Sequence, residues 1–392
     1  MKIAGVIAEY NPFHSGHAYH LQKTREQTGC DYVVVCMDGS YTQRGTAACL
    51  SKWDRARMAL QCGADAVFEL PALFAVRTAD VFALGGVGVL GGLGVNVLSF
   101  GSEVEDADLL NRLADLRDHE PEEVTAAIRK NLDLGMSHAR AWGAAAAEYM
   151  NLSPELLNSP NLTLGTEYIR AIRRLNLDMQ ISPVARLGQY HDADVNAEGY
   201  ASATAIRAAM EEGRMDDALS GVPSGVRDIL VNAGTMHDPD DLLLYRLRAM
   251  SEAEIAALPD VAEGLERRVK QCAGTAVSME ELIEAVKCKR YTRARLSRLM
   301  AHALLGLTQE LAQNHPQPTY ARLIGMRADA KPLLAELKQR AGLPITSDPV
   351  KLKDDPIFRL ECRATDLRAL QCDKKEDRRS GQEFTQKFVR AG

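Results

Sequence analysis

The stretch Ile3-Ala4-Gly5-Val6-Ile7-Ala8-Glu9-Tyr10-Asn11-Pro12-Phe13-His14-Ser15-Gly16-His17 decides the fold of this chain. Its first six residues form an uninterrupted apolar run, which indicates a short strand buried on both faces. Asn11 and Pro12 mark a loop after the strand, and helical spacing follows from about Ser15 to Gln27. A buried strand that leads through a short loop into a helix is the starting unit of a parallel α/β sheet.

The alternation of strand and helix continues over the first hundred residues. Further buried strands are predicted at 32–37, 66–70 and 95–100, and helices at 52–62 and 78–91. This order predicts a parallel sheet with right-handed crossovers, in which a ligand binds beyond the carboxyl ends of the strands. The first and fourth strands end at the loop 9–17 and the turn 101–103, which are expected to open onto the same edge.

The rest of the chain is richer in helical patterns. Residues 105–174 are mostly helical in pattern, 178–184 predicts one more strand, and almost everything after about residue 202 has helical spacing. A length of 392 residues suggests two domains. We place the boundary near residue 212, which gives an α/β domain at 1–212 and a mostly helical domain at 213–392.

Composition narrows the class of protein. The formal net charge of −6 excludes a globally basic nucleic-acid-binding surface, so any such contact needs a local patch. The eight cysteines form no C-x-x-C pair, which argues against a zinc ribbon. With no recognisable signal peptide and no apolar run of membrane-spanning length, a cytoplasmic location is expected, with neither a membrane nor DNA as a partner.

The histidine pair His14 and His17 carries the sharpest functional signal. Both lie at the start of the first helix, where unpaired N–H groups and a partial positive charge favour phosphate binding. Gly16 between them lets a ligand approach the backbone closely. The alternative is a pair of surface or capping histidines, but their position between the first strand and its helix favours a phosphate site. His20 either supports this site or covers the helix surface.

A second signal lies at Ala201-Ser202-Ala203-Thr204-Ala205-Ile206-Arg207. Ser202 and Thr204 suit a helix cap, and the forked guanidinium of Arg207 suits phosphate. Taken alone, the segment reads equally well as an ordinary N-cap followed by a surface arginine. Together with the histidine pair it favours a shared phosphate site.

A basic segment near residue 290 is the candidate RNA contact. It combines an aromatic ring with positive charge and no acid, in Lys287, Lys289, Arg290, Tyr291, Arg293, Arg295 and Arg298. A helix there would offer phosphate contacts and a ring for base stacking. The alternative is a solvated charged face. A second basic group, Arg44, Lys52, Arg55 and Arg57, is predicted either to position RNA or phosphates or to decorate a helix.

Several motifs together resemble one family. The histidine motif resembles the H-x-G-H nucleotidyl transferase superfamily, and the longer strings are similar to the bacterial tRNA(Met) cytidine acetate ligases. They are Gly5–His14, Gln43-Arg44-Gly45, Lys52-Trp53-Asp54-Arg55-Ala56, Gly63–Pro71, Phe100-Gly101-Ser102-Glu103 and Ser202–Arg207. The resemblance is close over the first 210 residues. It implies a Rossmann-like parallel sheet of the nucleotidyl transferase (HUP) type, with a mostly helical C-terminal domain that binds tRNA.

The resemblance also implies a reaction. Acetate attacks the α-phosphate of ATP, giving acetyl-adenylate and pyrophosphate, and N4 of the wobble cytidine of elongator tRNA(Met) takes the acetyl group. His14 and His17 are then the catalytic residues. ATP is a substrate that Mg²⁺ normally accompanies. The sequence shows no cluster of carboxylates typical of a dedicated metal site. Glu9, the one acid beside the loop, has either a role in the site or a purely structural one.

The ATP contacts implied by position include the whole loop and several later residues. They are Ile7, Ala8, Glu9, Tyr10, Asn11, Pro12, Phe13, His14, Ser15, Gly16, His17, Ala18, Tyr19, His20, Gly101, Asn161, Arg186, Leu187, Ser202, Thr204 and Arg207. The family usually has a second asparagine after the one at 161, whereas this chain has Leu162. Asn161 therefore also reads as a turn residue before a helix, and Arg186 as a surface arginine.

Two other function classes remain open. A small-molecule adenylyltransferase would use the same histidine motif, but it needs no large helical platform after residue 212. A non-catalytic RNA-binding protein would not need His14, His17 and Arg207 together. Transfer of label from acetate to RNA, or of AMP to a metabolite, distinguishes these classes.

Overall fold

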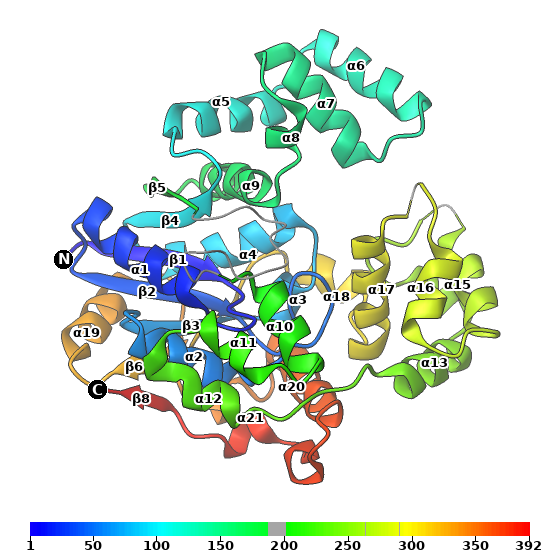
Figure 1. Ribbon diagram of the computed structural model, residues 1–392. Coiled ribbons are helices and arrows are strands. Elements are labelled where there is room, and N and C mark those ends of the chain that lie inside the picture. The colour runs from blue at the N-terminus through cyan, green and yellow to red at the C-terminus, as the bar shows by residue number, and fades with distance from the viewer. Residues whose placement is uncertain (187–200, 263, 290) are drawn as a thin grey trace.

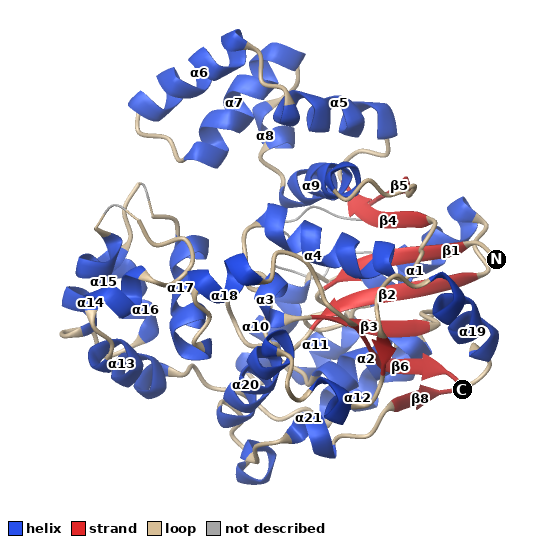
Figure 2. Cartoon of the chain, turned by 180° about the vertical axis from the view of Figure 1, so that it is seen from behind, coloured by secondary structure: helices blue, strands red, loops and turns tan. Residues whose placement is uncertain are grey.

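The computed structural model describes residues 1–186, 201–262, 264–289 and 291–392. A sheet of eight strands, counted over these residues, lies at the centre with helices on both faces (Figures 1 and 2). The order is β5-β4-β1-β2-β3-β6-β7, and β8 pairs with β6. The strands are β1 (Ile3–Ala8), β2 (Tyr32–Asp38), β3 (Ala66–Leu70), β4 (Val97–Ser102), β5 (Gln180–Ala185), β6 (Ala321–Arg327), β7 (Ile345–Thr346) and β8 (Val389–Ala391).

The helices fall into three groups along the chain. Those of the sheet region are α1 (Ser15–Thr28), α2 (Lys52–Gln61), α3 (Ala72–Ala75), α4 (Ala79–Gly92), α5 (Ala107–Asp118), α6 (Glu122–Asp133), α7 (His138–Met150), α8 (Pro154–Leu157) and α9 (Pro160–Arg174). The middle group is α10 (Ala203–Glu211), α11 (Met215–Ser220), α12 (Arg227–Val231), α13 (Asp240–Ala249), α14 (Glu252–Ala256), α15 (Leu265–Ala273), α16 (Met279–Val286), α17 (Arg293–Leu305) and α18 (Gln309–Asn314). The last are α19 (Lys331–Arg340), α20 (Pro356–Leu370) and α21 (Gln382–Thr385).

The strands β1 to β5 are parallel, as the alternating pattern predicts. β1 pairs with β2 on one side and with β4 on the other, and β5 pairs with β4. All five carboxyl ends therefore meet at one edge of the sheet. The loop after β1 and the turn after β4 open onto this edge, as expected from the sequence.

Each face of the sheet packs into its own apolar core. On β1, Ile3 and Ile7 belong to the core under α4 and α9, whereas Ala4 and Val6 belong to the core under α1 and α2. This period of two follows from the alternation of side chains along a strand. Gly5 faces α4, where an added Cβ would lie 2.8 Å from Leu90 Cδ1 and would force the Leu90 side chain to shift.

The expectation of an almost wholly helical chain after residue 202 was wrong at three places. β6 adds to β3 in antiparallel register, β8 pairs with β6, and β7 extends the edge. The pattern was missed because Arg322 and Gly325 interrupt the apolar run of β6. Arg322 is buried by ion pairs to Glu69 and Glu383, and Gly325 admits Val389 at close range.

A boundary near residue 212 does not separate two independent units. Residues of α13 to α17 form a lobe with a core of its own, which includes Leu243, Leu247 and Leu299. The segments on either side of that lobe belong to the sheet region. Before the lobe, α11 and α12 pack against α2, and after it, β6, β7 and β8 join the central sheet. Across the described ranges, no helix combines the length and apolar character needed to cross a bilayer.

Candidate active site

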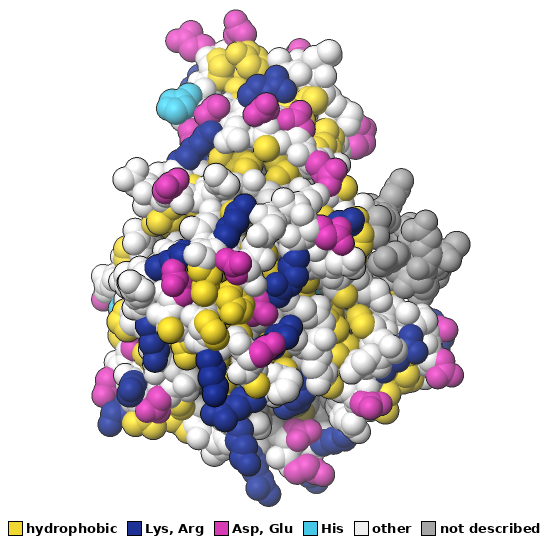
Figure 3. Space-filling view, turned by 90° about the vertical axis from the view of Figure 1, so that its left-hand side faces the viewer, with side chains coloured by type: hydrophobic (Ala, Val, Ile, Leu, Met, Phe, Trp, Pro, Cys, Tyr) yellow, Lys and Arg dark blue, Asp and Glu magenta, His cyan; other side chains and the backbone are white. Residues whose placement is uncertain are grey.

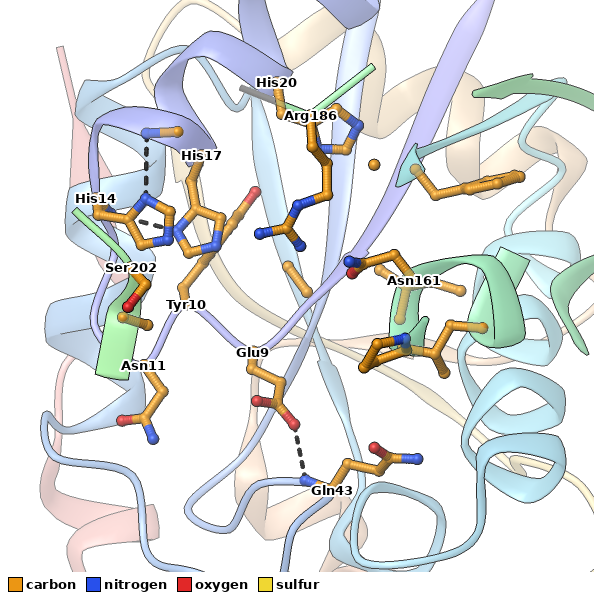
Figure 4. A pocket seen from close by; sticks show the side chains of 18 of the residues that line it. Glu9, Tyr10, Asn11, His14, His17, His20, Gln43, Asn161, Arg186 and Ser202 are labelled. Carbon is orange, nitrogen blue, oxygen red and sulfur yellow. Dashed lines mark hydrogen bonds between the residues drawn. The ribbon is translucent and has the colours of Figure 1, made fainter. Parts of the chain in front are cut away.

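A pocket of about 340 Å³ opens at the carboxyl edge of the sheet. Most of its lining comes from six segments that are far apart in the sequence: the loop after β1 with the start of α1, the turn 42–46, the end of β4, the end of β5, the start of α9, and the start of α10. Figure 4 draws lining side chains around one open space. The two sequence signals at 14–17 and 202–207 therefore meet in one site.

The two motif histidines close a capping box at the start of α1. The Nδ1 atom of His14 accepts the N–H of Gly16 at 3.1 Å, and the Nδ1 atom of His17 accepts the N–H of His14 at 3.2 Å. An imidazole whose Nδ1 accepts a hydrogen bond must, when neutral, carry its proton on Nε2. Each ring therefore offers one Nε2–H donor, and neither can rotate without losing its cap.

Aromatic packing fixes the two rings further. The rings of His14 and His17 stack with their centroids 3.7 Å apart, and Tyr10 meets His17 edge-on at 4.7 Å. Phe13 is fully buried and packs on both Tyr10 and His17. The histidine side chains are thus held in place before any ligand arrives.

Burial keeps the three histidines of α1 neutral. It lowers the pKa of His14 to about 3 and of His20 to about 4, with the positive charge of Arg186 as a further cause in both. The pKa of His17 lies well below its usual value for the same first reason, with His14 and His20 adding to it. At neutral pH these rings are uncharged hydrogen-bond donors, whereas the positive charge of the pocket comes from arginines.

This electrostatic arrangement predicts an acid-sensitive fold. Below pH 6.5, which is the ordinary pKa of histidine, the histidines bind protons in the unfolded chain but stay neutral in the folded one. The unfolding free energy is therefore fully present above that pH and falls as the pH drops toward 4. His20→Asn removes one such group. We expect it to reduce the loss of unfolding free energy between neutral pH and pH 5 by on the order of 1 kcal/mol, measured by urea denaturation at each pH. An unchanged pH dependence in the variant would show that His20 titrates normally in the folded protein.

The segment 202–207 lies beside the histidines. The Ser202 hydroxyl caps α10 by accepting the N–H of Ala205 at 3.0 Å. Arg207 donates to the backbone oxygen of Asn11 and, at 3.2 Å, to the Thr204 hydroxyl. Arg207 therefore ties α10 to the loop after β1, and its guanidinium lines the pocket.

The opposite part of the pocket is built on β4, β5 and α9. The Nδ2 atom of Asn161 donates to Glu103 at 2.7 Å, and Asn161 lines the pocket at the start of α9. Leu162, in place of a second asparagine, is buried in the core. Gly101 and Arg186 are neighbours at the ends of β4 and β5. Figure 4 shows Arg186 and Asn161 pointing into the open space.

Not every residue of the predicted ATP loop lines the pocket. Phe13 lies beneath it, and Ser15 instead donates to the backbone oxygen of Gly221, while Pro12 and Ala18 are also absent from its walls. Leu187 lies outside the described residues. Sequence reasoning missed Thr42, Gln43 and Thr46 as lining residues, although the Gln43-Arg44-Gly45 string pointed to their turn.

The second basic group divides into three environments. Lys52 and Arg55 are fully buried in ion pairs, so neither reaches RNA or decorates a surface. Arg57 is an exposed partner of Asp54, and Arg44 lines the pocket. The helical spacing of residues 52–57 could not show which side of α2 meets the core.

The basic segment near residue 290 is less open than its sequence suggests. Tyr291 is buried in the core of the lobe, so its ring is not free for base stacking. Arg293 forms ion pairs with Glu280 and Glu284, and Arg295 donates to the backbone oxygen of Asp260.

Lys289 is exposed and Arg298 is largely buried, and Arg290 lies outside the described residues. Figure 3 draws the left-hand side of Figure 1, which is the side away from α15 to α17, and acidic and basic side chains are interspersed there.

A cluster of buried carboxylates lies outside the pocket. Glu69, Glu361 and Glu383 converge, but the Lys52 ammonium occupies their centre and pairs with all three. A group that already holds an ammonium ion does not fit a metal cage. Among the described residues that line the pocket, Glu9 is the only carboxylate, so Mg²⁺ would have to be held mainly by the phosphates it accompanies.

Comparison with known proteins decides the family. A model of the HIGH nucleotidyl transferase family matches residues 1–383. The tRNA(Met) cytidine acetate ligase of Acetivibrio thermocellus is 34% identical, over 99% of this chain and 100% of that protein. The chain belongs to the tRNA(Met) cytidine acetate ligase family of HIGH nucleotidyl transferases. The ligase of the same name from Caldanaerobacter subterraneus subsp. tengcongensis is 34% identical, over 94% of this chain and 95% of that protein.

Solved structures of the family agree over the whole length. Thermotoga maritima TmcAL bound with alpha-thio ATP superposes with a TM-score of 0.89 at 30% identity, covering 100% of this chain and 99% of that chain. Its apo form superposes with a TM-score of 0.91. These comparisons confirm the resemblance inferred from the motifs and the α/β nucleotidyl transferase fold.

Proposed function

We propose that this chain is an ATP-dependent tRNA(Met) cytidine acetate ligase of the cytoplasm. It activates acetate as acetyl-adenylate and transfers the acetyl group to N4 of the wobble cytidine of elongator tRNA(Met). The observation that carries this proposal is the pair of Nε2–H donors at the start of α1, which lies beside Ser202 and Arg207 in one pocket. Full-length similarity to ligases of that name supports the choice of substrates.

In this proposal the phosphates of ATP lie at the start of α1. The Nε2–H groups of His14 and His17 and the guanidinium of Arg207 neutralise the charge that grows on the leaving pyrophosphate. Ser202 and Thr204 add hydroxyl contacts. Adenosine lies toward Gly101, Asn161 and Arg186. Mg²⁺ that accompanies ATP supplies further charge neutralisation on the phosphates when bound.

The chemical step needs no protein nucleophile. An acetate oxygen bonds to the α-phosphorus as the bond to the β-phosphate oxygen breaks, and pyrophosphate leaves. The cytidine N4 then attacks the acetyl carbonyl, AMP departs with the carboxyl oxygen, and N4 loses a proton. Because acetate is a weak nucleophile, the site contributes by positioning the reactants and neutralising charge.

A labelling experiment tests the proposal. The protein is incubated with ATP, labelled acetate and bulk tRNA, and the RNA is isolated. Label in the RNA is expected only when ATP is present. AMP transferred to a small metabolite, with unlabelled RNA, would instead favour a small-molecule adenylyltransferase. Binding of RNA without any ATP turnover would favour a non-catalytic RNA-binding protein.

The lobe of α13 to α17 is the proposed tRNA platform. We expect the double change Lys289→Glu and Arg293→Glu to weaken tRNA binding about tenfold and to reduce its salt dependence, because each reversal replaces a positive surface charge of the lobe with a negative one that repels phosphate. ATP affinity should not change. The measurement is filter binding of tRNA at several salt concentrations. The control is Lys351→Glu, an exposed lysine outside the lobe. Equal loss in the control would indicate a general charge effect and contradict a tRNA site on this lobe.

A further inference from the structure

The turn 42–46 forms a wall of the pocket that the roles proposed above leave unused. Thr42, Gln43, Arg44 and Thr46 line the pocket there, next to Glu9. Figure 4 shows Glu9 and Gln43 on the side away from His14, His17 and His20, while Asn161 lies on a third side and Arg186 lies between Asn161 and the histidines. With pyrophosphate and adenosine assigned to the other two sides, this wall is the one that faces the entering nucleophile.

The geometry of in-line displacement determines from which side acetate must approach the α-phosphorus. The attacking oxygen and the leaving oxygen lie on opposite sides of the α-phosphorus. If pyrophosphate leaves toward the start of α1, acetate must enter from the side of Glu9 and the turn 42–46.

The turn is rigid and joined to the ATP loop. Within it, the N–H of Thr42 bonds to the oxygen of Thr46 at 2.9 Å, and the N–H of Gly45 bonds to the oxygen of Thr42 at 3.0 Å. Its Gln43 N–H donates to a Glu9 carboxylate oxygen at 2.9 Å. Gly45 has a positive φ of 80°, and a Cβ there would lie 2.6 Å from the backbone oxygen of Ser297, so α17 abuts the turn directly.

One face of α20 holds the flanks of the turn. The hydroxyls of Thr365 and Ser40 bond at 2.8 Å, and Arg368 donates to the oxygen of Ala48 at 2.7 Å. Gln371 donates to the Tyr41 hydroxyl at 2.8 Å. Side chains of α20, near the C-terminus, therefore hold the turn in place. Such second-layer hydrogen bonds are expected where a residue must keep a fixed position against a ligand.

The charges on this wall suit a small monoanion. Arg44 brings a forked cation, which matches a carboxylate, and Gln43 adds an amide. Glu9, which accepts the Gln43 N–H, adds a negative charge to this wall and disfavours a polyanion. The phosphates have their own cation in Arg207 at the other wall.

We propose that Arg44, with Gln43, forms the subsite that holds the carboxylate of acetate for attack on the α-phosphate. This inference rests on the proposed ligase function. It makes the turn 42–46 the acceptor wall and the start of α1 the leaving-group wall of one pocket.

The test is the dependence of tRNA acetylation on acetate concentration in the full-length enzyme. Arg44→Gln should raise the KM for acetate about ten- to a hundredfold, as expected for the loss of a charge-assisted hydrogen bond. Arg44→Lys should give an intermediate value, and the dissociation constant of ATP should stay unchanged in both. The matched control is Arg57→Gln, an exposed arginine on α2 that pairs with Asp54.

Each other outcome overturns a distinct statement. An unchanged KM for acetate with a raised KM for tRNA would assign Arg44 to RNA and refute the subsite. A loss of ATP affinity would assign it to the nucleotide and refute the subsite equally. If the unsubstituted enzyme transfers no label to RNA, the ligase function itself is refuted, a result that is separable because it needs no variant.

Discussion

His14→Asn and His17→Gln will each lower tRNA acetylation about a hundred- to a thousandfold while leaving α1 intact. Asparagine is a good N-cap residue, and glutamine at the third helical position completes a capping box. Both changes therefore replace the Nδ1 cap acceptor seen in the structure and remove the imidazole Nε2–H. The expected loss matches the removal of one donor that stabilises transition-state charge.

The measurement is the rate of acetylation at saturating acetate and tRNA, with the unfolding free energy measured beside it. His237→Asn serves as the control, because His237 is an exposed histidine that pairs with Asp373 outside the pocket. Near-normal activity in both motif variants would mean that the histidines only cap the helix.

Lys52→Met will destabilise the fold by about 3–5 kcal/mol. The Lys52 ammonium is fully buried and pairs with Glu361 at 2.9 Å and with Glu69 and Glu383. Burial alone would lower the pKa of Lys52, but the three carboxylates outweigh it and raise the pKa, so the lysine is charged. Methionine fills the space, but Glu69 and Glu383 then share Arg322 and Glu361 loses its ion pair with Lys52, which leaves uncompensated buried charge.

Urea denaturation measures this effect. The control is Lys23→Met, which removes a solvent-exposed pair with Glu26 and should change the unfolding free energy far less. Adding Glu361→Gln to Lys52→Met should recover part of the loss, because it removes one unpaired charge. Equal destabilisation by Lys52→Met and Lys23→Met would show that the cluster contributes little.

The sequence predicts β1 to β4 because each is a mostly apolar run in a parallel sheet, and β5 is predicted although Gln180 and Ser182 interrupt its apolar pattern. β6 escaped prediction because its arginine is neutralised by Glu69, which lies 253 residues earlier in the chain. Lys52 and Arg55 were read as surface charges for the same reason, since their partners come from β2, β3 and the last hundred residues. Long-range ion pairs leave no local pattern, so charge alone cannot tell a buried lysine from a solvated one.

The candidate site was more accessible to sequence reasoning than its supports. His14, His17, Ser202 and Arg207 lie at helix starts, where local pattern and chemistry coincide. The turn 42–46 has no such pattern, and its place in the pocket depends on α17 and α20. The prediction for Tyr291 was wrong. An aromatic ring among basic residues suggested stacking on RNA bases, but the ring is buried in the core of the lobe.

The most direct test of the account is the identity of the modified nucleoside. Elongator tRNA(Met) that lacks the modification is incubated with this protein, ATP and isotopically heavy acetate, digested, and analysed by mass spectrometry. The proposed ligase activity predicts heavy N4-acetylcytidine at the wobble position, absent when ATP is omitted and strongly reduced with His14→Asn. Unmodified cytidine at that position after ATP has been consumed would contradict it.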